Sequence, residues 1–280
     1  KLDVDLVHFM TMPSSLWLHC PSVMTVMDVA FHRFPESVDY LRRIYYKSIM
    51  KQSIRTTDAI ITISNSSAKE IGELYPSALP KTFVTMLGLP RWTRIGKVNP
   101  MRDKSAPLLF VGSLEPRKNL DRILDAYLRF RKRNPESDLP ILTIVGGRGW
   151  LDEKLVARIL LLEKQQLVTW TRYCSTEKLI DIYQSSSALL FPSLHEGFGF
   201  PILESMAFNL PVITSDRGAM KEVSGGATLL VNPDCTDSIT HAIERLYFDS
   251  TIASQLVESG QERYRQFDWH QTAVETADVY

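Results

Sequence analysis

The feature that most constrains the fold is a regular alternation, over residues 108–231, of short apolar runs with stretches of helical character. The apolar runs are continuous, which is typical of strands buried on both faces of a parallel sheet. The expected strands are Leu108–Gly112, Ile141–Gly146, Leu167–Arg172, Ala188–Phe191, Val212–Ser215 and Thr228–Val231. The expected helices are Asn119–Arg133, Asp152–Lys164, Thr176–Ser185, Ile202–Asn209 and Met220–Val223. The alternation predicts an α/β domain whose parallel sheet is covered on both faces, with ligands at the carboxyl ends of its strands.

A second, shorter alternation occupies residues 1–90. Its expected strands are Asp5–Phe9, Val23–Met27, Ala59–Ile63 and Thr82–Leu87, and a long helix is expected over Val38–Thr56. Three or four strands are fewer than a complete doubly wound domain contains. Residues 1–90 are therefore expected to form a partial Rossmann-like domain.

The stretch from Pro90 to Pro107 is polar, aperiodic and interrupted by proline and glycine. Such composition is typical of a connection between domains, so residues 91–106 are expected to be a linker and residues 107–265 the second domain. After helices expected at Thr236–Phe248 and Ile252–Arg265, residues 266–280 are expected to form a last helix.

Two glutamates, Glu196 and Glu204, flank a glycine loop in the segment HEGFGFPILE. The segment follows a buried strand and leads into a helix, for which Pro201 is suited because the first helical position needs no N–H group. The glycines at 197 and 199 allow a ligand to approach the backbone, and the free N–H groups of a helix start favour a phosphate. Because a carboxylate beside a phosphate would repel it, both glutamates are expected to face hydroxyl groups. The alternative is that they are a solvated loop residue and a partner of the helix dipole.

The whole segment FPSLHEGFGFPILESMA resembles the signature of retaining glycosyltransferases of family four, also called glycosyl transferases group 1, which have the GT-B fold. The resemblance implies an α/β protein of two Rossmann-like domains whose parallel sheets face each other across a cleft. It assigns Glu196 to the donor sugar and Glu204 to the ribose of the nucleotide. The implied enzyme moves a hexose, mannose-like, from a nucleotide-diphosphate sugar to a glycan or lipid-linked acceptor in surface-polysaccharide synthesis. The family's opening strands and glycine-rich acceptor loop are not in this sequence, so the start of the N-terminal domain is expected to be missing.

Two cations, Arg117 and Lys118, lie just before a helix start in the segment GSLEPRKN. There they could neutralise a diphosphate and stabilise the charge that grows as the sugar–phosphate bond breaks. Two exposed charges at a helix terminus are the alternative, although cations there oppose the helix dipole. The resemblance assigns the donor phosphates to Lys118. The family often places another cation directly after the glycine, where this chain has Ser113, and Arg117 is a candidate for that role.

Further donor contacts come from the resemblance rather than from the residues alone. The glycine loop IVGGRGW and the stretch that follows the next strand border the nucleotide in the family. The donor-binding residues expected in addition to Glu204 are Gly112, Ser113, Gly146, Gly147, Tyr173, Gly197, Phe198, Gly199 and Phe200.

One position departs from the family pattern. Family members commonly carry His-Asp at the end of the second expected strand, whereas this chain has Met27-Asp28. A thioether cannot transfer a proton, which places turnover in question while Asp28 is still expected on the acceptor side. A nucleotide-sugar-binding protein without transfer activity is therefore an alternative, and a nucleotide-sugar epimerase is a more distant one.

The helix expected over Val38–Thr56 carries Arg43, Lys47, Lys51 and Arg55 at four-residue spacing. This spacing places the four cations on one face. A solvated face explains the pattern, and contact with an anionic membrane surface is the alternative.

Composition limits the classes of binding partner and cofactor that we expect. With zero net charge, the chain is not expected to have nucleic acid as its main partner. Its three cysteines are far apart in the sequence, which favours a protein of the reducing cytoplasm. If the basic helix contacts lipid, the expected location is the inner face of the membrane. The Asp3-Val4-Asp5 motif precedes a strand instead of following one, and without a carboxylate cluster neither a metal nor another cofactor is expected.

Overall fold

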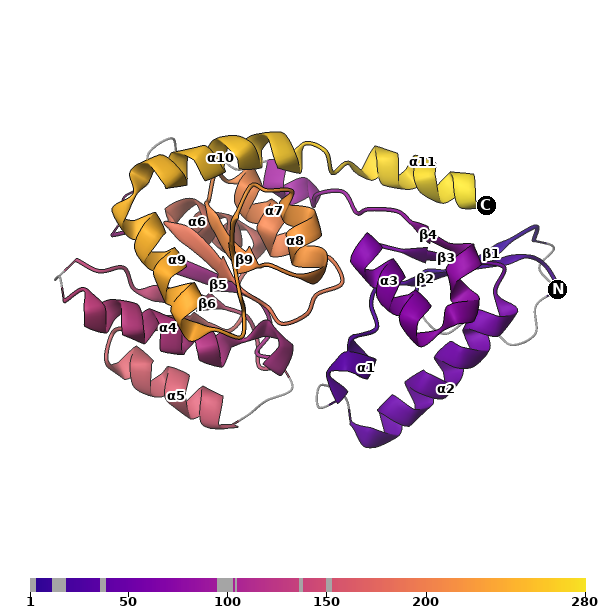
Figure 1. Cartoon of the computed structure of the whole chain (residues 1–280), viewed down its shortest axis with the longest axis horizontal. Helices are drawn as coiled ribbons and strands as arrows, with labels where there is room; N and C mark the ends of the chain where they lie inside the picture. The colour runs from indigo at the N-terminus through magenta and orange to yellow at the C-terminus, as the bar shows by residue number, and fades with distance from the viewer. Residues whose placement is uncertain are drawn as a thin grey trace. The chain divides into compact units, whose positions relative to one another are not determined.

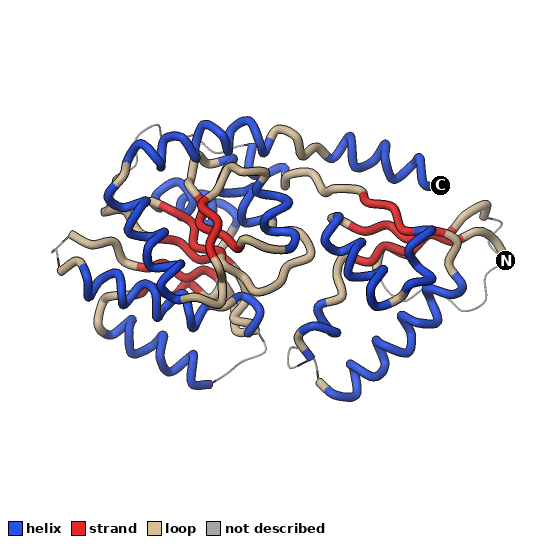
Figure 2. Tube along the Cα trace, viewed as in Figure 1, coloured by secondary structure: helices blue, strands red, loops and turns tan. Residues whose placement is uncertain are grey.

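The computed structural model describes residues 4–11, 19–35, 39–94, 103, 105–135, 138–149 and 153–280. Contacts divide the chain into two compact units. The first comprises Lys1–Gly88, Glu196–Phe198 and Phe267–Tyr280, and the second comprises Leu89–His195 and Gly199–Gln266. Figures 1 and 2 show a parallel sheet with helices around it in each unit.

The sheet of the first unit has four parallel strands in the order β1-β2-β3-β4. The strands are β1 (Val7–Phe9), β2 (Ser22–Val26), β3 (Ala59–Thr62) and β4 (Thr82–Val84). Each lies within a residue of, or inside, a stretch expected from the sequence. All the residues of β2 and β3 are buried, which agrees with their continuous apolar pattern.

Helices pack on both faces of this sheet. The elements between its strands are α1 (Ala30–Arg33), α2 (Tyr40–Thr56), α3 (Asn65–Leu74) and the 3₁₀ helix η2 (Pro76–Lys81). Met50 and Ile54 of α2 and Ile71 of α3 are buried against Met24 and Ile60 of the sheet. Helix α2 begins where the Asp39 carboxylate accepts the backbone N–H of Arg42. Val38, the start expected from the sequence, lies outside the described residues.

The last helix, α11 (Trp269–Val279), belongs to the first unit. Its Val279 packs near Val23 and Ile61 on the sheet face opposite the α2 side. The Thr272 hydroxyl donates to the carbonyl oxygen of Met86 at 2.6 Å. The C-terminus therefore completes the core of the N-terminal sheet.

The second unit holds six parallel strands in the order β10-β9-β8-β5-β6-β7. They are β5 (Leu108–Val111), β6 (Leu142–Val145), β7 (Val168–Thr171), β8 (Ala188–Phe191), β9 (Val212–Ser215) and β10 (Leu229–Val231). This is the doubly wound order, in which the chain reverses direction across the sheet between β5 and β8. Ligands of such folds bind at the carboxyl ends of the strands beside that reversal.

The helices of this unit follow the strands in sequence. They are α4 (Leu120–Arg133), α5 (Glu153–Lys164), α6 (Thr176–Ser185), α7 (Phe200–Ala207), α8 (Gly218–Ser224), α9 (Thr236–Phe248) and α10 (Ser250–Tyr264). The apolar faces of α4, α5 and α9 form one buried cluster with the sheet, centred on residues such as Phe110, Tyr127 and Ile243. Helix α7 packs against α8 and α10, as Figure 1 shows.

Sequence patterns did not indicate α1, α3 or the short 3₁₀ helices. One 3₁₀ helix, η3 (Arg91–Arg94), lies within the stretch expected to be a linker and belongs to the second unit. It brings the Trp92 ring to 6.0 Å from the Phe208 ring, centroid to centroid, in a stacked arrangement. Residues 95–102 and 104 of that stretch lie outside the described residues. Another, η4 (Pro116–Lys118), follows β5 and sets the position of the two cations.

Candidate functional site

Two glycine loops meet at the carboxyl ends of β5 and β6. The N–H of Gly112 donates to Val145 O at 2.9 Å. Gly146 has φ +153°, and a Cβ added to it would lie 1.9 Å from the carbonyl oxygen of Gly112. Since no side chain fits in that space, the two loops lie backbone against backbone. The neighbouring Gly147 is different, because a Cβ there would be 3.6 Å from its nearest neighbour, Arg172 O.

An ion pair that sequence patterns did not indicate shapes the loop after β5. Arg117 Nε donates to Glu115 Oε2 at 2.7 Å, and the Ser113 hydroxyl donates to the other carboxylate oxygen at 2.5 Å. Arg117 also donates through Nη1 to His195 O at 3.3 Å, and its own carbonyl accepts the N–H of Leu194 at 2.7 Å. Arg117 therefore joins the loops after β5 and β8, and Glu115 neutralises much of its charge.

Lys118, in the same loop after β5, is more deeply buried than Arg117. Its side chain is only 9% exposed. The ammonium nitrogen lies 5.2 Å from the centroid of the Phe191 ring, at the carboxyl end of β8. A buried cation at the carboxyl ends of the strands is suited to an anion that binds there.

Asn119 fixes these loops, and sequence patterns did not identify it. Its backbone is left-handed, with φ +61°, and it lies between η4 and α4. The side-chain amide donates to Pro192 O at 2.9 Å and to Pro233 O at 2.8 Å. One side chain thus ties the loops that follow β5, β8 and β10. An asparagine in a Lys-Asn pair before a helix is the signal that could have revealed it, since Asn tolerates the left-handed region.

Glu204 lies in α7, the helix that starts at this edge of the sheet, and it is 8% exposed. Its Oε2 accepts a hydrogen bond from the Tyr183 hydroxyl at 2.6 Å. Burial raises the pKa of Glu204 to about 7, and the bond from Tyr183 acts in the opposite direction. Burial and the nearby Glu204 charge raise the pKa of Tyr183 well above its ordinary value, so the phenol stays a donor.

The start of α7 has the geometry expected for a phosphate-binding turn. Gly199 is the N-cap, with φ +114°, a conformation that side chains rarely adopt. Phe200 and Pro201 open the helix, and Ile202 N donates to Gly199 O at 3.0 Å. Pro201 has no N–H and the Ile202 N–H is bonded within the turn, so this helix start offers an anion chiefly the positive end of its dipole.

The glycine loop before α7 belongs to the first unit, together with Asp28 and Met27. The Gly197 carbonyl accepts hydrogen bonds from Ser64 Oγ at 2.8 Å and Ser67 Oγ at 3.3 Å. Glu196 is buried, and Phe198 packs edge-on against Phe267 at 5.8 Å.

Met27 and Asp28 directly follow β2. Met27 is 41% exposed, and the Asp28 carboxylate accepts the N–H of Ala30 at 2.9 Å, at the start of α1. A Cβ at Gly197 would lie 2.8 Å from Met27 O and 2.9 Å from the Asp28 Cβ. Glycine is therefore required at 197 for a close backbone contact within this unit.

Tyr173 takes a different position from the buried residues above. It follows β7 and is 91% exposed. The preceding Arg172 instead lies over the Trp170 ring, with its guanidinium carbon 4.3 Å from the ring centroid. If Tyr173 contacts a nucleotide, it does so as an exposed surface residue.

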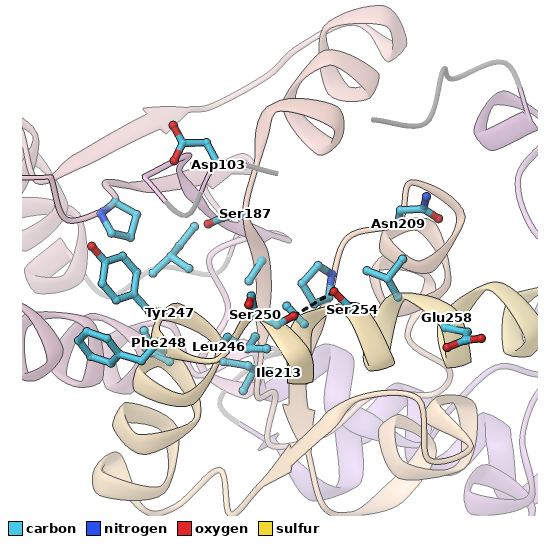
Figure 3. A pocket seen from close by; sticks show the side chains of 17 residues that line it. Asp103, Ser187, Asn209, Ile213, Leu246, Tyr247, Phe248, Ser250, Ser254 and Glu258 are labelled. Carbon is cyan, nitrogen blue, oxygen red and sulfur yellow. Dashed lines mark hydrogen bonds between the residues drawn. The ribbon is translucent and has the colours of Figure 1, made fainter. Parts of the chain in front are cut away.

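A cavity of about 650 Å³ lies at the opposite, amino-terminal edge of the second sheet. It is bounded by the first residues of β5 and β8, Leu108 and Ala188, and by side chains of α9 and α10 (Figure 3). Its polar lining includes Asp103 and Glu258. None of the motif residues described above lines it, so it is separate from the candidate site.

The described part of the chain has neither a candidate metal cluster nor a candidate membrane-spanning helix. No cluster of three or more His, Cys, Asp or Glu side chains suited to a metal ion occurs there, and Asp3 of the early motif lies outside it. Within the same residues, no helix has the length and apolar character that crossing a membrane requires.

Comparison with known proteins identifies the family. The sequence profile of the glycosyl transferases group 1 matches residues 93–263. The chain belongs to this family of glycosyltransferases. It is 29% identical to the O-antigen chain mannosyltransferase B of Escherichia coli over 92% of its own length and 70% of that protein. It is 30% identical to the O-antigen chain mannosyltransferase RfbU of Salmonella typhimurium over 80% of its own length, spanning 60% of that relative.

Solved structures agree on the fold. Sucrose-phosphate synthase of Thermosynechococcus elongatus superposes with a TM-score of 0.80 at 18% identity, over 100% of this chain and 74% of that one. WaaG, a glycosyltransferase involved in lipopolysaccharide biosynthesis, gives a TM-score of 0.74 at 16% identity, over 98% of this chain and 76% of that one. The expected α/β GT-B fold and glycosyltransferase activity class are confirmed. The group 1 glycosyltransferase thus places its motif glycines, Lys118 and Glu204 where doubly wound sheets bind ligands.

Proposed function

We propose that this group 1 glycosyltransferase moves a hexose, mannose-like, from a nucleotide-diphosphate sugar to a glycan or lipid-linked acceptor of a surface polysaccharide. The observation that carries the proposal is the burial of the Glu204 carboxylate beside the helix start that opens at Gly199. Burying a carboxylate with a raised pKa lowers stability, and such perturbed groups concentrate at functional sites. Mannose is favoured because the two curated relatives described above are mannosyltransferases.

The donor roles follow from charge and hydrogen-bonding capacity. Lys118 and the positive end of the α7 dipole would hold the diphosphate, because both present positive charge at the carboxyl ends of the strands. Glu204, as a carboxylate, would accept the ribose hydroxyls, and Glu196 would accept those of the sugar. Arg117 would act chiefly by fixing the loop, since its guanidinium is paired with Glu115.

The reaction would proceed with retention. The bond between the anomeric carbon and the diphosphate oxygen breaks, and the acceptor hydroxyl forms its new bond on the face that the diphosphate leaves. The acceptor proton passes to the departing phosphate oxygen, so Met27 is not needed as a proton carrier. The protein's contribution is to hold the reactants and to stabilise the diphosphate charge, which a preorganised cation and a helix dipole do well. We expect no metal cofactor, because Lys118 and α7 supply that compensating charge.

An acceptor linked to lipid would suit the surface of α2. Tyr40, Leu41, Ile44 and Tyr45 are exposed apolar or aromatic residues on this helix. They alternate with cations, of which Lys47, Lys51 and Arg55 are exposed, and Arg43 lies over the Tyr40 ring at 5.4 Å. Apolar side chains with neighbouring cations are the composition that binds anionic membrane surfaces.

The membrane contact has its own test. The protein should co-sediment with vesicles in which roughly one third of the lipid is anionic. A variant with Lys47, Lys51 and Arg55 changed to Gln should stay in solution. Replacing Lys132, Lys154 and Lys178 of the second unit by Gln is the matched loss of three charges. Equal binding by both variants would assign no role to α2.

The function itself is tested by calorimetry beside a transfer assay on the same preparation. GDP-mannose and UDP-glucose serve as donors, and a polyprenyl-diphosphate-linked oligosaccharide and water serve as acceptors. We expect micromolar binding of one donor and sugar transfer to the lipid-linked acceptor with retained anomeric configuration. No binding of either donor would remove the proposal, and binding without transfer would favour a nucleotide-sugar-binding protein instead.

A further inference from the structure

Tyr183 is a buried polar residue to which neither the signature nor the reaction assigns a part. It lies in α6 and its side chain is fully buried. Its hydroxyl donates to Glu204 Oε2 at 2.6 Å. Among the described residues, this is the one side-chain hydrogen bond that the Glu204 carboxylate receives, and Oε1 is left for another donor.

The ring of Tyr183 is held as firmly as its hydroxyl. It stacks on Phe208, with centroids 5.4 Å apart and planes inclined by 14°. Trp92 of η3 lies against the same pair, 6.1 Å from the Tyr183 ring. These ring contacts restrict the Tyr183 side chain and so fix the place of its hydroxyl.

Stability alone does not explain why the polar groups of Tyr183 and Glu204 are paired in this core. Apolar residues of the same volume usually stabilise a core as well as or better than a buried charged pair. A carboxylate that receives one hydrogen bond at a single oxygen keeps acceptor capacity on the other, which binding the hydroxyls of a ligand requires. We propose that Tyr183 positions the Glu204 carboxylate for the ribose of the donor nucleotide, an inference that rests on the donor-binding function proposed above.

Electrostatics support the same role. Burial raises the pKa of Glu204, and the Tyr183 bond partly offsets that rise by favouring the charged form. The charged side chains of the elements packed against α7 include Lys221 and Glu222 of α8 and Arg263 of α10, and none of them contributes to this pKa. Without Tyr183, more of the protein would carry a neutral Glu204 at pH 7, which accepts ribose hydroxyls poorly.

The test compares Tyr183→Phe with Tyr127→Phe. Tyr127 is an equally buried tyrosine of the same unit, but its hydroxyl donates to backbone carbonyls, those of Pro140 and Leu167, at 3.0 and 2.8 Å. Calorimetry measures the dissociation constants of GDP, UDP and 2′,3′-dideoxy-GDP at pH 7 and pH 9. A second pair of proteins carries each change in a Glu204→Gln background.

We expect Tyr183→Phe to weaken binding of the preferred nucleotide about tenfold at pH 7, the size of a lost hydrogen bond to a charged group. Much of that loss should return at pH 9, where Glu204 is ionised, and no loss should appear with the dideoxy nucleotide. In the Glu204→Gln background Tyr183→Phe should have little further effect, and Tyr127→Phe should leave affinity unchanged.

The outcomes separate the two ideas. If the unaltered protein binds neither GDP nor UDP, the donor-binding function and the role of Tyr183 both fall. If it binds, but Tyr183→Phe weakens GDP and dideoxy-GDP alike at both pH values, Tyr183 acts only through packing and this inference alone is overturned. An equal loss with and without Glu204 would lead to the same conclusion.

Discussion

Replacing Glu204 by Gln should raise the free energy of unfolding of the ligand-free protein, relative to that of the unaltered protein, as the pH increases. The carboxyl has a pKa of about 7 in the folded protein, against an ordinary value of 4.5. Because the folded state holds the proton more tightly than the unfolded state, the carboxyl contributes stability below pH 4.5. That contribution is lost as the pH rises through about 7.

The size of the effect follows from the two pKa values. A pKa difference of about 2.5 corresponds to roughly 3 kcal/mol, and most of it, about 2 to 3 kcal/mol, falls between pH 5 and pH 8. Glutamine has nearly the same shape and cannot ionise. The free energy of unfolding of Glu204→Gln, relative to that of the unaltered protein, should therefore rise by that amount between the two pH values. Changes in packing affect both pH values alike and cancel, and the effect of the Tyr183 bond on ionisation is already contained in the folded-state pKa.

The assay is urea unfolding of the unliganded protein, followed by circular dichroism at pH 5 and pH 8. Hydrogen exchange of peptides covering residues 200–207 assigns the change to α7. Glu262→Gln, an exposed position on α10, is the matched loss of one carboxylate and should show a difference near zero. If Glu204→Gln showed the same small pH dependence as Glu262→Gln, the carboxylate would not be held in a desolvated place, and the argument from its burial would be refuted.

Three further outcomes are expected. Glu196→Gln should weaken nucleotide-sugar binding about tenfold while leaving the bare nucleoside diphosphate nearly unchanged in calorimetry; equal losses for both ligands would show that Glu196 does not meet the sugar. Binding of the donor should persist in excess chelator, and strong dependence on added magnesium or manganese would contradict charge compensation by Lys118 and α7. Gly146→Ala should lower the free energy of unfolding by about 2 to 4 kcal/mol, because its Cβ would meet Gly112 O at 1.9 Å, whereas Gly147→Ala should be nearly neutral. Similar unfolding midpoints for the two glycine variants would count against the close contact of the loops.

The sequence by itself determined the layered architecture and much of the site. Continuous apolar runs separated by helical stretches can be satisfied only by parallel strands covered on both faces, and all six strands expected between residues 108 and 231 are present. Gly199 and Pro201 marked the start of α7 because both act through their own backbone geometry. Properties carried by a residue and its neighbours along the chain are readable in this way.

Only the tertiary structure decided which side chains work together. Tyr183 and Glu204 are 21 residues apart on different helices, and neither residue's position in the sequence indicates the other. The same holds for Asn119, whose amide joins loops at Pro192 and Pro233, and for the place of Trp92 beside Phe208. The order in which strands assemble brings distant segments to one edge of a sheet. Packing then sets which buried polar groups meet, and their hydrogen bonds fix the charge of a residue such as Glu204.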